Sequence, residues 1–316
     1  MANQNFKRFL NMDVLHFLLM LSTLSTVIGC GGTPFSHIDT RLQGTWIREG
    51  DEFNGMIIEI QPQDRESFEA VLLWAPRRAQ SDGFTIGDIK MRNIKFKTTG
   101  SHEYLAESLT RGQNTGNAYY SEGRLSMPDG DRIYWKDIAH TESIGTKQYW
   151  KRLVDGDPDM PLAWYGKAIA ELQAERFSVA LPLLVKISKS KLDNASVLNS
   201  VAWTLATSSE IKIRNPSASL VAAKRACELS ENDNAMYLDT LAAAWAANGN
   251  FEQARKTQAL AIEKLDAYDS DEKNATRKFL KQEFGVWGLE EGYKLHRQEF
   301  QEREELFSRG KAYIEE

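Results

Sequence analysis

Residues 238–261 read LDTLAAAWAANGNFEQARKTQALA, and this stretch decides the architecture of the C-terminal half of the chain. Apolar and alanine residues recur at helical spacing on both sides of Asn248-Gly249-Asn250, which predicts two helices joined by a tight turn. Small residues such as Ala242 and Ala254 let the two helices approach closely, while aromatic side chains fill the remaining volume. The stretch therefore predicts a hairpin of packed helices.

Two similar units precede this hairpin. The first carries Trp164, Ala168, Phe177, Ala180, Leu184 and Ile187, and the second carries Val201, Ala202, Leu205 and Ala226. In the second unit about five extra residues lie in the loop Thr207–Pro216. In the first unit Lys167 stands where the tetratricopeptide pattern, compared with these units next, has a leucine. Helix pairs repeating near every 34 residues are typical of tetratricopeptide repeats. Residues 161–265 resemble about three repeats of this family.

The resemblance implies a concave groove that is lined by the first helix of each pair and binds a protein or peptide. Carried over by position, the groove residues are Tyr165, Ile169, Leu172, Asn199, Trp203, Met236 and Asp239. Trp203 on such a face could equally be a core residue. Some family members bind a peptide carboxylate with Asn plus Lys or Arg, but no basic residue accompanies Asn199 at the matching positions.

The segment 266–316 departs from the repeat pattern. Residues 271–284 and 290–307 predict charged amphipathic helices, separated by Gly285-Val286-Trp287-Gly288. Terminal helices with a polar outer face are what a helical-repeat array needs to cap its core. We therefore expect 266–316 to be capping helices.

Residues 40–153 have a different periodicity and precede a turn-rich acidic linker at 154–160. Eight runs of alternating or β-branched and aromatic residues predict strands: Gly44–Arg48, Met56–Gln61, Phe68–Trp74, Ile86–Lys97, Glu103–Thr110, Ala118–Ser126, Arg132–Lys136 and Thr146–Leu153. Pro128-Asp129-Gly130-Asp131 is a strong hairpin signal. The whole chain is thus predicted to be an α+β protein of two domains, an antiparallel barrel or sandwich followed by an all-α helical-repeat domain.

Both ends of the β region resemble lipocalin-like barrels. Gly44-Thr45-Trp46 matches the Gly-x-Trp of a first strand, and the resemblance implies that Arg152 packs across this tryptophan. We expect Trp46, Trp74, Trp135 and Trp150 to be core residues. A small barrel of eight strands either holds one small apolar ligand or is filled by side chains, and the sequence leaves both open.

The N-terminal residues are predicted to be a targeting signal. Lys7 and Arg8 precede an apolar run over 14–28, which is short for a spanning helix. The run ends in Val27-Ile28-Gly29-Cys30, which resembles a bacterial lipoprotein signal. The resemblance implies that 1–29 are removed, that Cys30 is lipidated and that 30–39 form a tether. Because Gly31 rather than an acidic residue follows, the cell envelope's outer membrane is favoured over its inner membrane.

Composition argues against several function classes. A net charge of −5 gives no overall basic field for nucleic acid. Two cysteines cannot form a disulfide framework, the five histidines show no metal-pair spacing, and motifs for common catalytic sites are absent from the sequence. We predict no catalytic, cofactor or metal site, and expect a membrane-anchored adaptor whose groove binds a protein or peptide. The alternatives are a carrier of a lipid or small apolar ligand in the barrel, and a purely structural envelope protein.

Overall fold

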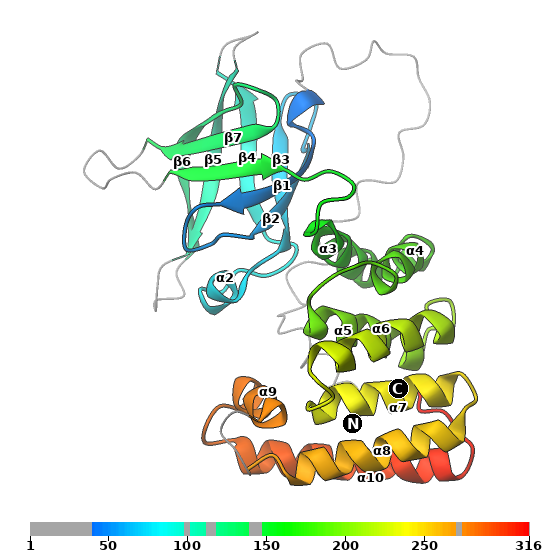
Figure 1. Ribbon diagram of the computed structural model, residues 1–316. Helices are drawn as coiled ribbons and strands as arrows, with labels where there is room; N and C mark the ends of the chain where they lie inside the picture. Colours follow the sequence, from blue (N-terminus) through cyan, green and yellow to red (C-terminus); the bar gives the residue numbers. More distant parts are fainter. Residues whose placement is uncertain (1–39, 98–101, 112–117, 139–146, 270–273, 316) are drawn as a thin grey trace.

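The computed structural model describes residues 40–97, 102–111, 118–138, 147–269 and 274–315 (Figure 1). The predicted signal peptide, the tether and Cys30 lie outside these ranges. The chain forms two parts, an antiparallel β-barrel of eight strands and then an all-α region of paired helices. This confirms the predicted fold class and decides for the barrel over the sandwich.

The strands follow one another around the barrel in sequence order, and β1 pairs with β8 to close it. Their bounds are β1 Gly44–Glu49, β2 Ile57–Pro62, β3 Phe68–Trp74, β4 Ile89–Phe96, β5 Glu103–Arg111, β6 Ala118–Ser126, β7 Arg132–Asp137 and β8 Gln148–Arg152. The main difference from the predicted strands is at β4, which begins three residues after Ile86. There the Asp88 carboxylate accepts a hydrogen bond from the Thr85 backbone and holds a turn.

Large side chains fill the barrel interior. Trp46, Trp135 and Trp150 are at most 2% exposed, as predicted for core residues. A Cβ on Gly123 would lie 2.2 Å from the Trp135 ring, so a larger residue there would displace the tryptophan. The interior is therefore packed by its own side chains over much of its length.

Arg152 joins three segments at one end of the barrel. Its guanidinium lies 4.1 Å from the centre of the Trp46 ring and donates hydrogen bonds to the Gln43 and Gly130 carbonyls. Gly44 has φ of +131°, and a Cβ there would approach the Arg152 guanidinium to 2.7 Å. Glycine at the first position of Gly44-Thr45-Trp46 thus leaves the space that the arginine occupies.

The prediction that Trp74 belongs to the barrel core is wrong. Trp74 is half-buried on the outer side of the barrel and packs edge-to-face against Tyr165 of the helical region, with ring centres 6.3 Å apart. A short helix that the sequence did not predict, α2 (Arg77–Ser81), follows Pro76 at one end of the barrel (Figure 1). Its Ala79 and the adjacent Phe84 are buried against the barrel core.

The helical region contains α3 Met160–Gln173, α4 Phe177–Ser188, α5 Ala195–Thr207, α6 Pro216–Leu229, α7 Ala235–Ala247, α8 Phe251–Asp266, α9 Ala275–Phe284 and α10 Leu289–Ser308. Asparagine side chains cap the N-termini of the five helices α5 to α9. The predicted contact alanines, including Ala202, Ala242 and Ala254, are fully buried. The extra residues predicted in the loop Thr207–Pro216 lie between α5 and α6.

The barrel and the helices share a packed interface. Gly166 of α3 lies against the backbone of Leu73 in β3, and no side chain fits between them. Lys167, where the predicted repeat pattern has a leucine, pairs with Glu59 of β2 at 2.5 Å. Ile57 and Leu73 of the barrel belong to the same buried cluster as α3 to α8. The two parts are therefore not independent modules.

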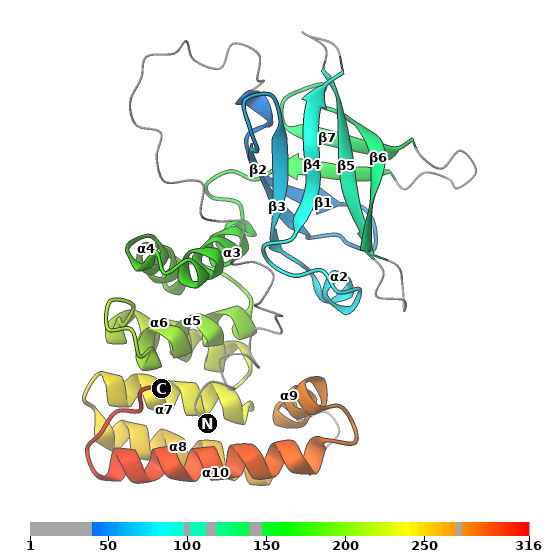
Figure 2. The same cartoon turned by 180° about the vertical axis from the view of Figure 1, so that it is seen from behind.

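The helices form a stack that begins at the barrel. The pairs α3/α4, α5/α6 and α7/α8 follow one another, and α10 lies against α8 at the far end (Figures 1 and 2). Helix α9 lies on the same side of the stack as α2 in both views. Among the helices of the described ranges, none has both the length and the apolar character to cross a membrane.

Candidate functional site

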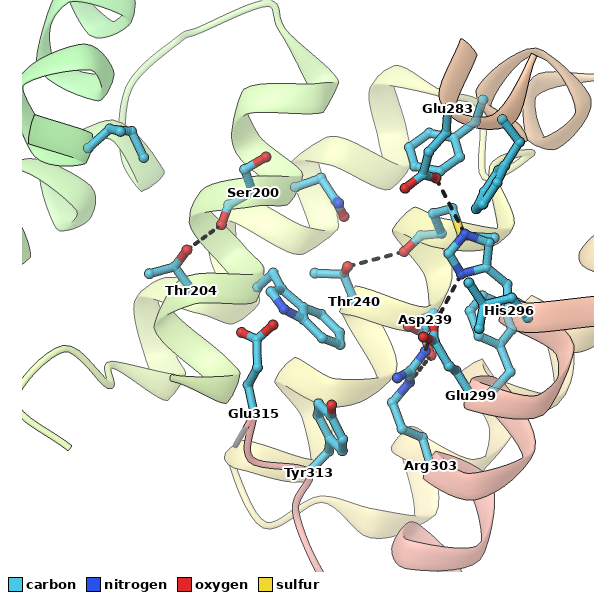
Figure 3. A pocket seen from close by; sticks show the side chains of 18 of the residues that line it. Ser200, Thr204, Asp239, Thr240, Glu283, His296, Glu299, Arg303, Tyr313 and Glu315 are labelled. Carbon is cyan, nitrogen blue, oxygen red and sulfur yellow. Dashed lines mark hydrogen bonds and ion pairs between the residues drawn. The ribbon is translucent and has the colours of Figure 1, made fainter. Parts of the chain in front are cut away.

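A cavity of about 180 Å³ opens along one side of the helical stack, and we call it the groove (Figure 3). Its walls come from α3, α5 and α7, which are the first helices of the three pairs, and from α9, α10 and the C-terminal residues. The structure brings all seven predicted groove residues to this one cavity: Tyr165, Ile169, Leu172, Asn199, Trp203, Met236 and Asp239.

Tyr165 connects three parts of the molecule. Its hydroxyl is hydrogen-bonded to Ser200 of α5, its ring contacts Trp74 of the barrel, and its burial raises the pKa of the phenol. Replacing Tyr165 by alanine would therefore disturb the interface between barrel and helices as well as the groove wall. Tyr165 is a structural bridge at the barrel end of the groove.

Asn199 is the unusual residue of the groove. Its side chain lies on α5 and is 6% exposed, yet its Oδ1 accepts no hydrogen bond from the residues that the structure describes. A buried acceptor left without a donor costs about 1–3 kcal/mol, so such groups are rare in the absence of a reason. A ligand in the groove that displaces the atoms covering this oxygen and brings an N–H donor would remove this cost.

Asp239 lies on α7, at the position that the predicted repeat pattern matches to Asn199, but has its partners within the chain. Its Oδ1 accepts hydrogen bonds from Arg303 Nε of α10 and from Gln258 Nε2 of α8, both at 2.8 Å. Both Asp239 and Arg303 are about 95% buried. Asp239 therefore fastens α10 to the stack, and its carboxylate is already engaged within the chain.

His296 links α9 and α10 at the far wall of the groove. Its ring nitrogens lie 3.4 Å from a Glu283 oxygen and 3.2 Å from a Glu299 oxygen (Figure 3). Burial by itself opposes protonation, but the two carboxylates outweigh it and raise the pKa of His296 to about 9. The imidazolium is thus charged at neutral pH and stabilises the position of α9.

Sequence reasoning did not find the second wall of the groove. Phe279, Glu283, His296, Glu299, Arg303 and Tyr313 all come from the segment predicted only to cap the repeats. Their helical periodicity showed amphipathic helices but not which part of the stack those helices would face. Trp203 has both roles that the sequence left open, because it lines the groove and also packs in a cluster with Phe307 and Tyr313.

The groove is equipped for binding by shape and hydrogen bonding. Within the described ranges, no three His, Cys, Asp or Glu side chains are grouped to hold a metal ion. Cys227 is buried outside the groove, and burial raises the pKa of its thiol to about 12, which makes it a weak nucleophile at neutral pH. Aromatic and aliphatic side chains with a few polar groups are typical of a site that holds an organic or peptide ligand.

No protein-family model matches the chain, and no curated protein matches it in sequence. The geometry of the groove is therefore the basis for assigning a function.

Proposed function

We propose that the protein is a non-catalytic adaptor of the bacterial cell envelope. A lipid on Cys30 holds it at the membrane, with the outer membrane favoured, and the groove binds an extended segment of a protein partner. The helix pairs α3/α4, α5/α6 and α7/α8 would be tetratricopeptide repeats that build this groove. Each element of the proposal has its own test.

The observation that carries the proposal is the unsatisfied Asn199 Oδ1 in the wall of the groove. An extended peptide presents backbone N–H groups along its length, and one of them would supply the missing donor. Ile169 and Leu172 line the same cavity and offer apolar contacts for the side chains of such a segment. A backbone donor and apolar side chains together fit a peptide better than a purely apolar lipid.

The test is co-purification from cross-linked, detergent-solubilised membranes. We expect Leu172→Ala and Asn199→Leu each to reduce recovery of a specific partner at least several-fold. Leu260→Ala is the matched control, since Leu260 is a 37% exposed leucine on α8 and does not line the groove. The same partner recovered equally with all three variants would contradict the proposal, and no partner would favour the purely structural alternative.

A truncated protein that ends near Gly156, and therefore lacks the helices, would test the groove less well than these point variants. Removing the helices would expose Ile57 and Leu73, which are buried in one cluster with residues of the helices. An isolated barrel with such a newly exposed apolar face would bind other proteins nonspecifically.

The anchor is tested separately. Metabolic labelling with a radioactive fatty acid should label the wild-type protein but not Cys30→Ser, and the variant should leave the membrane fraction. Label on the Cys30→Ser variant would contradict lipidation at this cysteine, without bearing on the groove.

The alternative function, a carrier of a lipid or small apolar ligand in the barrel, rests on the lipocalin-like resemblance alone. The contact between Trp135 and Gly123 shows a tightly filled interior at that level of the barrel. Mass spectrometry of organic extracts of the purified protein tests the carrier. A lipid present in stoichiometric amount would favour it.

A further inference from the structure

We infer that the Trp203 end of the groove is a subsite for an extended peptide carrying an aromatic residue and, two positions later, an acidic residue. In the free chain, residues 312–315, which we call the tail, fill this subsite. A binding peptide can take their place. The inference deepens the proposed function and rests on it in one respect, because the partner's segment is taken to displace this tail.

The end of α10 directs the tail into the groove. Gly310 has φ of +67°, and the backbone N–H groups of Gly310 and Lys311 donate to the Phe307 and Leu306 carbonyls. These two bonds form a Schellman turn, which reverses the chain at a helix C-terminus. The residues that follow have no regular secondary structure and end beside α7 and the end of α5 (Figure 1).

The aromatic part of the subsite is formed by Trp203 and Arg303. The Tyr313 ring lies 5.7 Å from the Trp203 ring and 5.2 Å from the Arg303 guanidinium carbon, so it is held by an aromatic and a cation–π contact (Figure 3). Ala312 and Tyr313 also pack against a buried cluster that Ala242, Ala243 and Ala246 of α7 form with Ala254 and Phe307.

The polar part of the subsite binds the backbone and the acidic side chain. The Glu315 N–H donates to the Thr207 carbonyl at 2.7 Å, and this carbonyl is one that the end of α5 leaves without a helical partner. Burial raises the pKa of Glu315, while the Trp203 indole, which donates to its carboxyl group, and the charge of Arg303 oppose this rise. Backbone, ring and acid are thus each recognised, as in a bound peptide.

A partner segment could displace the tail from the subsite. Residues 312–315 are only half-buried, and a covalently tethered segment fills its site even when its intrinsic affinity is weak, because its effective concentration is millimolar. The tail does not satisfy Asn199 Oδ1, which lies in the same groove. A partner segment that matches the tail and also reaches Asn199 would have the advantage over it.

The experiment uses 5-fluorotryptophan-labelled protein and fluorine NMR, with the Trp203 resonance assigned from Trp203→Phe. We expect this resonance to shift in a variant ending at Gly310, while those of the barrel tryptophans stay in place. Adding a synthetic peptide of residues 310–315 should return the resonance toward its full-length position. The same peptide with Tyr313→Ala should require at least about tenfold more peptide, because it lacks the ring contacts.

Two results would overturn the inference. One is no response of the truncated variant to the peptide up to its solubility limit, and the other is an equal response of full-length and truncated protein. A full-length Tyr313→Ala variant, which keeps α10 and Glu315, serves as a second protein to which the peptide is added. If both variants lose the fold of α9 and α10, the tail is a structural strap and the inference is wrong.

The outcomes separate this inference from the proposed function. Peptide binding at Trp203 together with a cellular partner that is insensitive to groove substitutions would leave the subsite and remove the adaptor role. A partner lost with Leu172→Ala but unaffected by deletion of the tail would keep the adaptor role and remove the subsite.

Discussion

At the scale of single residues, a substitution of Asn199 should weaken partner binding without lowering the stability of the fold. Its Oδ1 is buried and lacks a donor in the free chain. Leucine has a similar volume and no acceptor to desolvate, so Asn199→Leu should leave the free energy of unfolding unchanged or raise it by about 1–2 kcal/mol. Urea unfolding measures this. A clear loss of stability would show that Asn199 is needed for the fold, contrary to the role in binding.

His296 gives the groove wall a pH dependence with a defined sign. Its pKa is about 9 in the folded chain against an ordinary value of 6.5, so its stabilising charge is fully present below pH 6.5. This contribution is lost as the pH rises through 9, up to about 3 kcal/mol for such a shift. Glu283 and Glu299 are its charged partners, and Arg303 in turn pairs with Glu299.

The check is unfolding of the helical region between pH 6 and pH 10 in wild type and His296→Gln. We expect the wild type to lose stability over this range and the variant to lose distinctly less. Identical pH profiles would show that the histidine does not couple to the two glutamates.

At the scale of elements, Arg152 of β8 stabilises one end of the barrel. It binds carbonyls of the segment before β1 and of the turn before β7, and it stacks on Trp46. Lysine keeps the charge but not the planar fork of donors, so Arg152→Lys should destabilise the barrel by about 2 kcal/mol. Lys151→Arg, on an exposed neighbour, is the control. A thermal midpoint equal to that of the control would refute the role given to Arg152.

The elements also show what the sequence could and could not predict. All eight strands followed from residue alternation, because alternation is a local property of the sequence. The seven groove residues of α3, α5 and α7 were carried over by position from the resemblance to tetratricopeptide repeats. The pairing of Asp239 with Arg303 joins residues 64 positions apart, and nothing in the local pattern of α10 says which face it meets. The pairing of Lys167 with Glu59 of the barrel joins residues 108 positions apart and was likewise out of reach of the local pattern.

At the scale of the whole molecule, the packed interface between the barrel and the helical stack contains one very close backbone contact. A Cβ at Gly166 would fall 1.8 Å from the Leu73 carbonyl oxygen, which is backbone and cannot rotate away. Gly166→Ala should therefore separate the two parts, with an increased radius in X-ray scattering. The neighbouring Lys167→Ala removes only a partly exposed ion pair and should change little. Equal scattering profiles for both variants would contradict this contact.

The central claim is that the groove is the binding surface, and site-specific photo-crosslinking in cells tests it most directly. A photoreactive phenylalanine analogue would be placed at Leu172 in the groove and, as control, at Val221, a 48% exposed residue of α6. The account predicts a discrete crosslinked protein from Leu172 that is absent from Val221 and weakened by Asn199→Leu. The same products from both positions, or products from Val221 alone, would contradict it.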